Sequence, residues 1–175
     1  QFYDSKNGGF YFSSQAHEGL FHHSKIFFDD ATPSGNAIAA KVLLRLGFLT
    51  GELGFVDIAE QMLKTLNTHM KSRLDATSSL NSVVMEYLQP IDVVILRGFK
   101  KDLKLWQSKT RKLLKKRTIC YAIPESESDL PEGLSSKIFE GVTVAYICHG
   151  FSCSKPINDF KNYQEYLTDS SARAQ

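Results

Sequence analysis

Two short apolar runs on either side of one amphipathic stretch constrain the fold more than any other feature of this sequence. Residues 91–96 (IDVVIL) and 118–123 (TICYAI) are rich in β-branched side chains, and each has the length of a buried strand. Between them, residues 100–114 carry apolar side chains at helical spacing. A strand, a helix and a strand at this spacing predict a βαβ unit with parallel strands and a right-handed crossover.

The remainder of the second half of the chain continues the pattern. Residues 142–148 (VTVAYIC) predict a third strand, and residues 157–167 predict a final helix. The crossover helix should bury Trp106 and the other apolar side chains of its stripe against one face of the sheet. Because parallel strands are normally covered on both faces, we expect the final helix or the preceding helices to cover the other face.

Helical periodicity dominates the first half of the chain. A helix is predicted over residues 33–50, with Thr32 as its cap and Pro33 in its first turn. Two further helices are predicted over residues 53–72 and 77–88, and the short link between the first two implies an αα-hairpin. The apolar stripe of the first helix should consist of Ile38, Val42, Leu46 and Leu49.

The first thirty residues are rich in Gly, Ser, His and aromatic side chains and show no helical period. Two aromatic runs, at residues 10–12 and 25–28, lie on either side of a polar loop and predict an irregular hairpin. Together these patterns predict an α+β chain in two parts. Residues 1–89 would be helical behind the irregular hairpin, and residues 90–175 would contain the βαβ unit.

Composition and charge exclude several classes of protein. With 42% hydrophobic and 23% charged residues, the 175-residue chain can bury a core. Its 21 Lys and Arg nearly balance 19 Asp and Glu, which argues against nucleic acid or an acidic membrane as partner. Three cysteines and the lack of a secretory leader favour a cytoplasmic location. The first residue is not methionine, so we expect a piece of a longer protein.

The crossover helix is strongly basic. Residues 100–117 carry nine Lys and Arg side chains against the single acidic residue Asp102. Such a face can contact phosphates, but interleaved stacking aromatics are missing because Trp106 belongs to the apolar stripe. A solvated basic face, or one that docks on an acidic partner, is therefore favoured. The acidic loop at residues 125–132 offers one such partner within the chain.

Cys148, His149 and Cys153 suggest a metal or redox site. Structural zinc requires four ligands, and the four residues between these two cysteines put the pair at the upper end of the spacing that zinc pairs show. Cys120 is the only further thiol. We therefore expect no metal and two unpaired cysteines, while a disulfide between Cys148 and Cys153 stays sterically possible.

Several short motifs together resemble a known family. They are Gly8–Gly9–Phe10–Tyr11, His17–Glu18, Lys25, the run from Asp30 to Asn36, Leu49–Thr50–Gly51, and the late spacing of Cys148, Cys153 and Pro156. This arrangement is similar to the C-terminal part of the family that includes bacterial YyaL and spermatogenesis-associated protein 20. The resemblance covers about residues 2–167, and the run from Asp30 to Asn36 is its most specific piece.

The resemblance implies a fold and a context. Full-length members of the family resemble a thioredoxin-like domain followed by an (α/α) toroid of the six-hairpin glycosidase type. This chain would then hold the terminal helical hairpins of the toroid and a small βαβ-containing C-terminal portion. Its partners would be the thioredoxin-like domain and the other toroid helices of the longer chain. The cysteine motif of the thioredoxin-like domain lies outside this sequence, so no redox role and no cofactor is carried over.

The loop before the first helix is the first candidate site. In toroids of the resembled type, loops at one end of the helix barrel line a sugar-binding cleft, which implies a sugar-like ligand near Asp30. A helix start presents free N–H groups to hydroxyl-rich or anionic ligands. We therefore expect Ser34, Gly35 and Asn36 to bind the ligand, with Gly35 allowing it close to the backbone. The alternative is a plain capping sequence in which Asp30 satisfies the first-turn donors.

His17, Glu18 and Lys25 form the second candidate site. A histidine beside a carboxylate can carry out general acid–base chemistry, as in the epimerases and isomerases that share this toroid class. We therefore take His17, Glu18 and Asp30 as candidate catalytic residues and Lys25 as a binding residue. The alternative is an exposed polar loop, because adjacent residues of an extended segment point to opposite sides.

Two functions follow from these patterns. The first is a carbohydrate-binding or carbohydrate-modifying toroid module, which requires ionisable groups that converge on a cavity if it is an enzyme. The second is a non-catalytic scaffold that docks the thioredoxin-like domain or another protein, which requires only a continuous apolar or basic surface.

Overall fold

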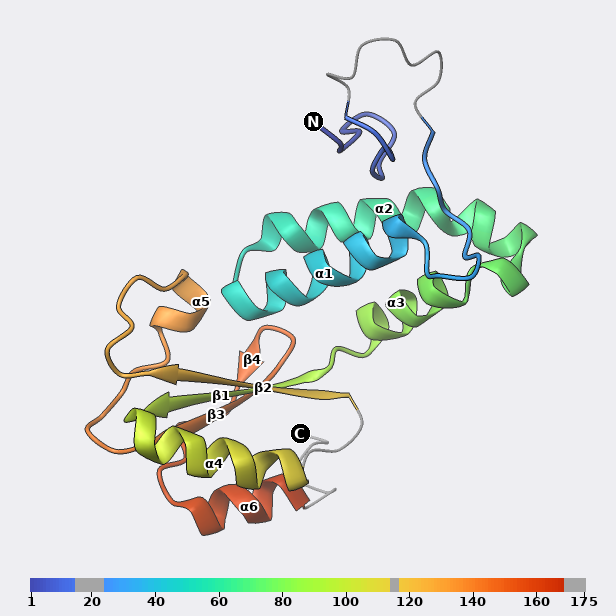
Figure 1. Ribbon diagram of the computed structural model, residues 1–175. Coiled ribbons are helices and arrows are strands. Elements are labelled where there is room, and N and C mark those ends of the chain that lie inside the picture. The colour runs from blue at the N-terminus through green and yellow to red at the C-terminus, as the bar shows by residue number, and fades with distance from the viewer. Residues whose placement is uncertain (15–23, 114–116, 169–175) are drawn as a thin grey trace. The chain divides into compact units, whose positions relative to one another are not determined.

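The computed structural model describes residues 1–14, 24–113 and 117–168, and it divides the chain into two compact units (Figure 1). The first unit contains Gln1–Phe48 and Glu52–Gln89, and the second contains Leu49–Gly51 and Pro90–Gln175. Helices make up most of the first unit, and a four-stranded mixed sheet lies at the centre of the second. The predicted α+β class is confirmed.

Three helices form the first unit: α1 (Gly35–Thr50), α2 (Leu53–Ser72) and α3 (Ser78–Leu88). All three were predicted, but α1 begins two residues later than expected. Its cap is Ser34 and not Thr32, because the Ser34 hydroxyl accepts a hydrogen bond from the Ala37 N–H at 3.1 Å. The Ser34 N–H in turn donates to Asp29, which leaves Thr32 and Pro33 in the loop outside the helix.

The face that α1 buries differs from the predicted one. Ala37, Ala40 and Leu44 are fully buried against α2 and α3, whereas the larger Ile38, Val42 and Leu46 are 46%, 49% and 38% exposed. Small side chains explain the choice, because they let α1 approach α2 closely. At Gly47 of the same face, an added Cβ would overlap the side chain of Val56. The predicted stripe is therefore wrong for Ile38, Val42 and Leu46, which form an exposed apolar row, while its last member, Leu49, packs in the second unit.

The sheet of the second unit confirms the βαβ prediction. Strand β1 pairs in parallel with β2, with Asp92 opposite Thr118, and α4 connects the two strands. On its other side β1 pairs antiparallel with β3, which continues into the short strand β4. The elements are β1 (Asp92–Gly98), α4 (Lys100–Leu113), β2 (Thr118–Pro124), β3 (Val144–His149) and β4 (Ser152–Cys153).

The two faces of the sheet are covered differently. Val94 and Leu96 of β1 point to one face and pack under Trp106 of α4 and Tyr163 of α6 (Phe160–Thr168). Val93 and Ile95 point to the other face, where the covering side chains are Leu49, Leu130 and Leu134. Leu134 belongs to the short helix α5 (Glu132–Ser135).

The expectation that the final helix covers the second face is wrong. Helix α6 lies beside α4 on the same side of the sheet (Figure 1). The connection to α6 first pairs Ile157 with Ala145 of β3, and the chain then continues into α6 beneath α4. The second face is therefore covered by Leu49 and by the segment around Leu134. These apolar residues are too few to give a recognisable pattern in the sequence.

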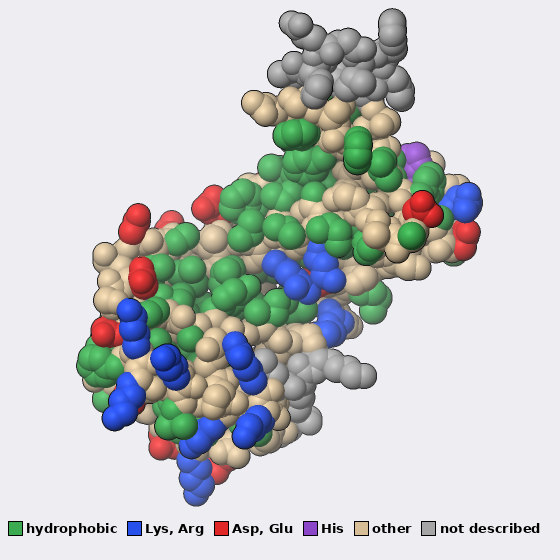
Figure 2. Space-filling model, in the orientation of Figure 1, with side chains coloured by type: hydrophobic (Ala, Val, Ile, Leu, Met, Phe, Trp, Pro, Cys, Tyr) green, Lys and Arg blue, Asp and Glu red, His purple; other side chains and the backbone are tan. Residues whose placement is uncertain are grey.

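The basic side chains of α4 face solvent, as predicted, and Figure 2 shows them gathered on the surface over this helix. Within the described part of the chain, no ion pair joins α4 to the acidic loop at residues 125–132. None of the helices within the described ranges is both long and apolar enough to cross a membrane.

Cys148 and Cys153 form a disulfide, so the expectation of two unpaired cysteines is wrong. The two residues are direct partners across β3 and β4, with their Cα atoms 3.9 Å apart. A tight turn containing Gly150, with φ of 57°, brings the strands together. Cys120 remains free, and burial raises the pKa of its thiol to about 11.

Candidate functional site

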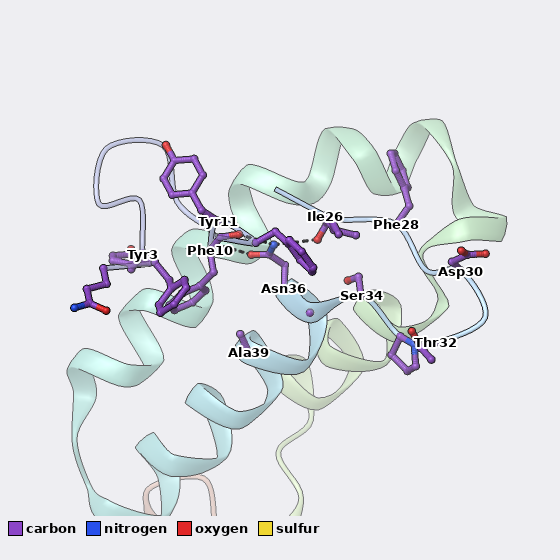
Figure 3. A pocket seen from close by; sticks show the side chains of 15 residues that line it. Tyr3, Phe10, Tyr11, Ile26, Phe28, Asp30, Thr32, Ser34, Asn36 and Ala39 are labelled. Atoms are coloured by element: carbon purple, nitrogen blue, oxygen red, sulfur yellow. Dashed lines mark hydrogen bonds between the residues drawn. The ribbon is translucent and has the colours of Figure 1, made fainter. Parts of the chain in front are cut away.

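A cavity of about 810 Å³ lies at the N-terminal end of α1, within the first unit (Figure 3). Its walls are mostly aromatic and apolar, and its polar groups come from the loop and first turn before and within α1. A mostly apolar cavity with a few polar groups is typical of small-molecule sites. The wall residues are Phe2, Tyr3, Phe10, Tyr11, Phe12, Ile26 and Phe28, and the loop and helix contribute Asp30, Thr32, Pro33, Ser34, Gly35, Asn36 and Ala39.

The aromatic wall depends on a glycine turn near the start of the chain. Gly8 and Gly9 have φ angles of 72° and 81°, in the left-handed region that glycine adopts without strain. The turn brings Tyr3 opposite Phe10 in an antiparallel bridge, with ring centroids 5.2 Å apart. The predicted hairpin is therefore present in part, but its bridge joins residues 3 and 10. The two aromatic runs lie near each other: the Phe12 N–H donates to the Ser24 carbonyl at 2.9 Å, and Lys25 Nζ lies over the Tyr11 ring.

Asn36 ties three segments of the site together. Its Oδ1 accepts a hydrogen bond from the Phe10 N–H at 2.6 Å, and its Nδ2 donates to the carbonyls of Phe10 and Ile26, both at 3.0 Å (Figure 3). The side chain is 3% exposed. Both amide hydrogens are thus used within the protein. Asn36 lines the cavity as expected, and its amide holds the aromatic wall against α1.

Asp29 holds the loop that leads into α1. Its carboxylate accepts hydrogen bonds from the Ser34 N–H at 2.9 Å, from the Ser79 N–H at 2.8 Å and from the Ser79 hydroxyl. Desolvation opposes ionisation, but these three hydrogen bonds outweigh it and lower the pKa of Asp29. Asp29 therefore accepts from the cap residue of α1 and from the first turn of α3, whereas Asp30, which the capping alternative assumed, bonds no donor of the first turn of α1 among the described residues.

Asp30 is left available to a ligand. It is exposed, it lines the cavity, and within the described residues its carboxylate has no hydrogen-bond partner. Figure 3 places it at the Phe28 end of the cavity. Among the cavity-lining residues that the structure describes, it is the only Asp or Glu.

The first turn of α1 supplies donors to the same cavity. The backbone N–H groups of Gly35 and Asn36 make no hydrogen bond to another described residue. A Cβ added at Gly35 would meet nothing within 4 Å, so the backbone there is open to the cavity. The helix start therefore offers two N–H donors to a ligand.

Lys25 does not line the cavity. Its Nζ lies 2.7 Å from Asp4 Oδ2, donates to the Gly8 carbonyl at 2.6 Å, and sits 4.8 Å from the centroid of the Tyr11 ring. The Tyr11 hydroxyl also donates to Asp4 Oδ2, at 2.8 Å. Lys25 therefore positions the aromatic wall through an ion pair with the buried Asp4. The contacts of Asp4 and Tyr11 with Lys25 were not predictable from the sequence, because they depend on the glycine turn.

The Asp4–Lys25 pair predicts a pH dependence of stability. The Lys25 ammonium, with hydrogen bonds from Asn7 and Tyr11, holds the pKa of Asp4 well below its ordinary value of 3.8. The contribution of Asp4 is therefore fully present above pH 3.8 and is lost as the pH falls through the folded-state pKa. We expect Asp4→Asn to lower the Tm at neutral pH, and the difference from wild type to shrink in increasingly acidic buffers.

Circular dichroism melts across a pH series measure this difference. Asp57→Asn is the matched control, because Asp57 is exposed on α2. Its Tm difference from wild type should be small at every pH. A difference for Asp4→Asn that stays constant from neutral to strongly acidic pH would contradict the assignment.

His17 and Glu18 lie outside the described residues. Within the described ranges, no group of three or more His, Cys, Asp or Glu side chains is arranged to hold a metal ion. The described site thus combines aromatic walls, two backbone donors and one carboxylate, a set that suits a ligand with apolar faces and hydroxyl groups.

Comparison with known proteins places this chain beside one curated relative. Human spermatogenesis-associated protein 20 is 28% identical to it over 173 residues, which cover 90% of the chain. The chain spans only 21% of the length of that relative. No family model matches the chain, and no solved structure matches it.

Proposed function

We propose that this chain is a carbohydrate-binding or carbohydrate-modifying module of an (α/α) toroid. The proposal starts from the similarity to spermatogenesis-associated protein 20, which extends along most of the chain. The cavity at the start of α1 carries this proposal. It joins aromatic walls to the free carboxylate of Asp30 and the unpaired N–H groups of Gly35 and Asn36.

The chemistry of the lining fits a sugar ring. Sugars present apolar C–H faces, which pack on aromatic side chains such as Phe10 and Phe28, and hydroxyl groups, which need donors and acceptors at fixed positions. Gly35 and Asn36 supply backbone donors, and Asp30 supplies an acceptor. Ser34 keeps α1 capped, so that these donors stay aimed at the cavity.

A modifying activity needs a second ionisable group beside Asp30. Asp30 would act as general acid or base, since its carboxylate is free and reaches the cavity. His17 and Glu18 are our candidates for the second group, because they lie in the segment that joins the two cavity-lining aromatic runs. Lys25 would act indirectly, by holding Asp4 and Tyr11 in place.

The exposed apolar row of α1 supports the toroid context. In a toroid each helix packs against neighbours on two sides. The buried face of α1 packs within the first unit, and Ile38, Val42 and Leu46 form a second apolar row that faces solvent. We propose that another helix of a longer chain covers this row.

Titration calorimetry with a panel of neutral and charged sugars tests the proposal. Gly35→Leu should fill the cavity and weaken binding of any sugar at least tenfold, because a side chain at Gly35 projects into open space without strain. Gly54→Leu is the matched control, since Gly54 also has open space and lies in the first turn of α2, away from the cavity. A sugar that binds Gly35→Leu as well as wild type would contradict the site.

Asp30→Asn separates binding from modification. The amide keeps the shape of the carboxylate but cannot transfer a proton, so turnover of a modified sugar should fall by about 10²–10⁴-fold. Binding of a neutral sugar should change far less. If no sugar of the panel binds the wild-type protein, the carbohydrate proposal fails.

The second candidate function is a non-catalytic scaffold that docks the thioredoxin-like domain of a longer chain. The same exposed row of α1 favours it, since docking needs only a continuous apolar surface. Under this alternative no sugar binds, and Val42→Glu abolishes docking while Gly35→Leu leaves it intact. Under the carbohydrate proposal Gly35→Leu is the damaging change for binding.

A further inference from the structure

Strand β2 forms one edge of the sheet in the second unit and has none of the usual protections of an edge. It is seven residues long (TICYAIP), carries no charged side chain, and has its proline only at the last position. Natural proteins shorten, charge or kink their edge strands to prevent pairing with another chain. The opposite edge follows this rule, because β4 has only two residues.

The ladder between β1 and β2 shows which backbone groups point outward. The Asp92 N–H donates to the Arg117 carbonyl, and the Glu125 N–H donates to the Gly98 carbonyl. In the parallel register, these bonds show that the odd-numbered residues of β2 direct their backbone N–H and C=O groups toward β1. Thr118, Cys120 and Ala122 therefore direct their N–H and C=O groups away from the sheet, and no hydrogen bond joins these groups to another described residue.

We propose that β2 of a second copy of this chain pairs antiparallel with β2, across a two-fold axis, and joins the two sheets into one. Charge complementarity selects this occupant. Arg117, directly before the strand, is basic, and the acidic residues Glu125, Glu127 and Asp129 follow the strand. Antiparallel pairing of two copies sets each basic end beside an acidic end, whereas parallel pairing sets like charges together.

The strand length fixes the register. Full overlap of two β2 strands places Tyr121 opposite Tyr121 of the second copy, and Cys120 opposite Ala122 of the second copy. The outward-facing residues Cys120 and Ala122 then form hydrogen-bonded pairs, as antiparallel geometry requires. On the other sheet face, half-buried Ile119 meets Ile123 of the second copy, beside the 37% exposed Tyr121. The pairing therefore satisfies the free backbone groups of Cys120 and Ala122 and also buries apolar side chains.

The oligomeric state in solution tests the proposal, independently of the carbohydrate proposal. Sedimentation equilibrium should give a mass about twice the 19.7 kDa of one chain. Tyr121→Lys places two ammonium groups side by side on the axis and should weaken association at least tenfold. The control Ile138→Lys adds the same charge at a 61% exposed position outside the strands and should leave the dimer intact.

A cross-link tests the register. In antiparallel pairing, Tyr121 and its counterpart form a non-hydrogen-bonded pair with Cα atoms about 4.5 Å apart, which is within the range of a disulfide. Tyr121→Cys in a Cys120→Ala background should therefore give a covalent dimer with oxidised glutathione, and Ile138→Cys in that background should not. Three results would overturn the proposal: a monomeric wild type at every soluble concentration, a dimer unaffected by Tyr121→Lys, or equal cross-linking of the control.

Discussion

Replacing Trp106 by alanine should destabilise the second unit by about 3–5 kcal/mol, the usual cost of deleting a large buried aromatic side chain. Trp106 is 9% exposed and lies between α4 and the sheet. Its ring stacks on Tyr163 at 5.5 Å and meets Phe160 edge-on at 5.0 Å. Alanine would leave a cavity that the rigid sheet below cannot close.

The substitution should also disturb a buried polar contact. The Thr110 hydroxyl lies 2.8 Å from the Tyr163 hydroxyl, and the Tyr163 ring that stacks on Trp106 carries that group. Chemical denaturation followed by circular dichroism measures the loss. Leu105→Ala is the matched control, because Leu105 lies on the same helix and is 52% exposed, so its effect should stay within about 0.5 kcal/mol. A Trp106→Ala protein with the stability of the control would contradict the packing of α4.

Asn36→Ala should destabilise the first unit by about 3 kcal/mol. The change leaves the N–H and C=O of Phe10 and the C=O of Ile26 without their partner, and an unsatisfied buried polar group costs about 1–3 kcal/mol. Water that enters the widened cavity can bond to these three groups, which reduces their total cost. The aromatic wall should then separate from α1, and sugar binding should be lost together with stability.

Denaturation of the first unit and protease sensitivity of residues 1–12 measure this effect. Asn67→Ala is the matched control, because Asn67 is exposed on α2. Asn36→Asp keeps the acceptor and loses both donors, so its effect should resemble that of alanine. An unchanged unfolding transition in both Asn36 variants would show that the Asn36 amide does not hold the aromatic wall against α1.

The elements of the second unit were predictable because their signals are local. The β-branched runs of β1 and β2 and the helical period of α4 are each complete within about fifteen residues, and their order alone implies parallel strands. The cover of the second face was not predictable, because it rests on Leu49, Leu130 and Leu134, which lie far apart in the sequence.

The first unit shows where periodicity stops being informative. Helix α1 has two apolar rows, and the pattern favours the row of larger side chains. The structure buries the row of alanines, because only small residues allow the close approach that Gly47 and Val56 require. How closely two helices approach each other depends on the side chains of both helices. It therefore cannot be predicted from the sequence of one helix alone.

Most residues of the run from Asp30 to Asn36 line the cavity, but the contacts that each of them makes were not predictable from the sequence. Among the residues that the structure describes, the Asp29 carboxylate accepts hydrogen bonds and the Asp30 carboxylate does not, because the donor Ser79 lies next to Asp29; Ser79 is fifty residues later in the sequence. The role of Lys25 likewise depends on Asp4, twenty-one residues earlier. Neighbouring carboxylates look alike in a sequence until the distant donor that selects one of them is known.

The central position of β1 in the sheet also sets an order of assembly during synthesis. Strand β1 and its parallel neighbour β2 are separated by one helix, so they emerge from the ribosome in quick succession. The antiparallel neighbour β3 begins only at Val144, forty-six residues after β1 ends at Gly98. Until then the nascent chain carries an apolar strand, β1, with one edge unpaired. The segment between β1 and β3 must fold back before β3 can pair with that edge. Translation speed between residues 98 and 149 therefore determines how long this chain is open to misassembly.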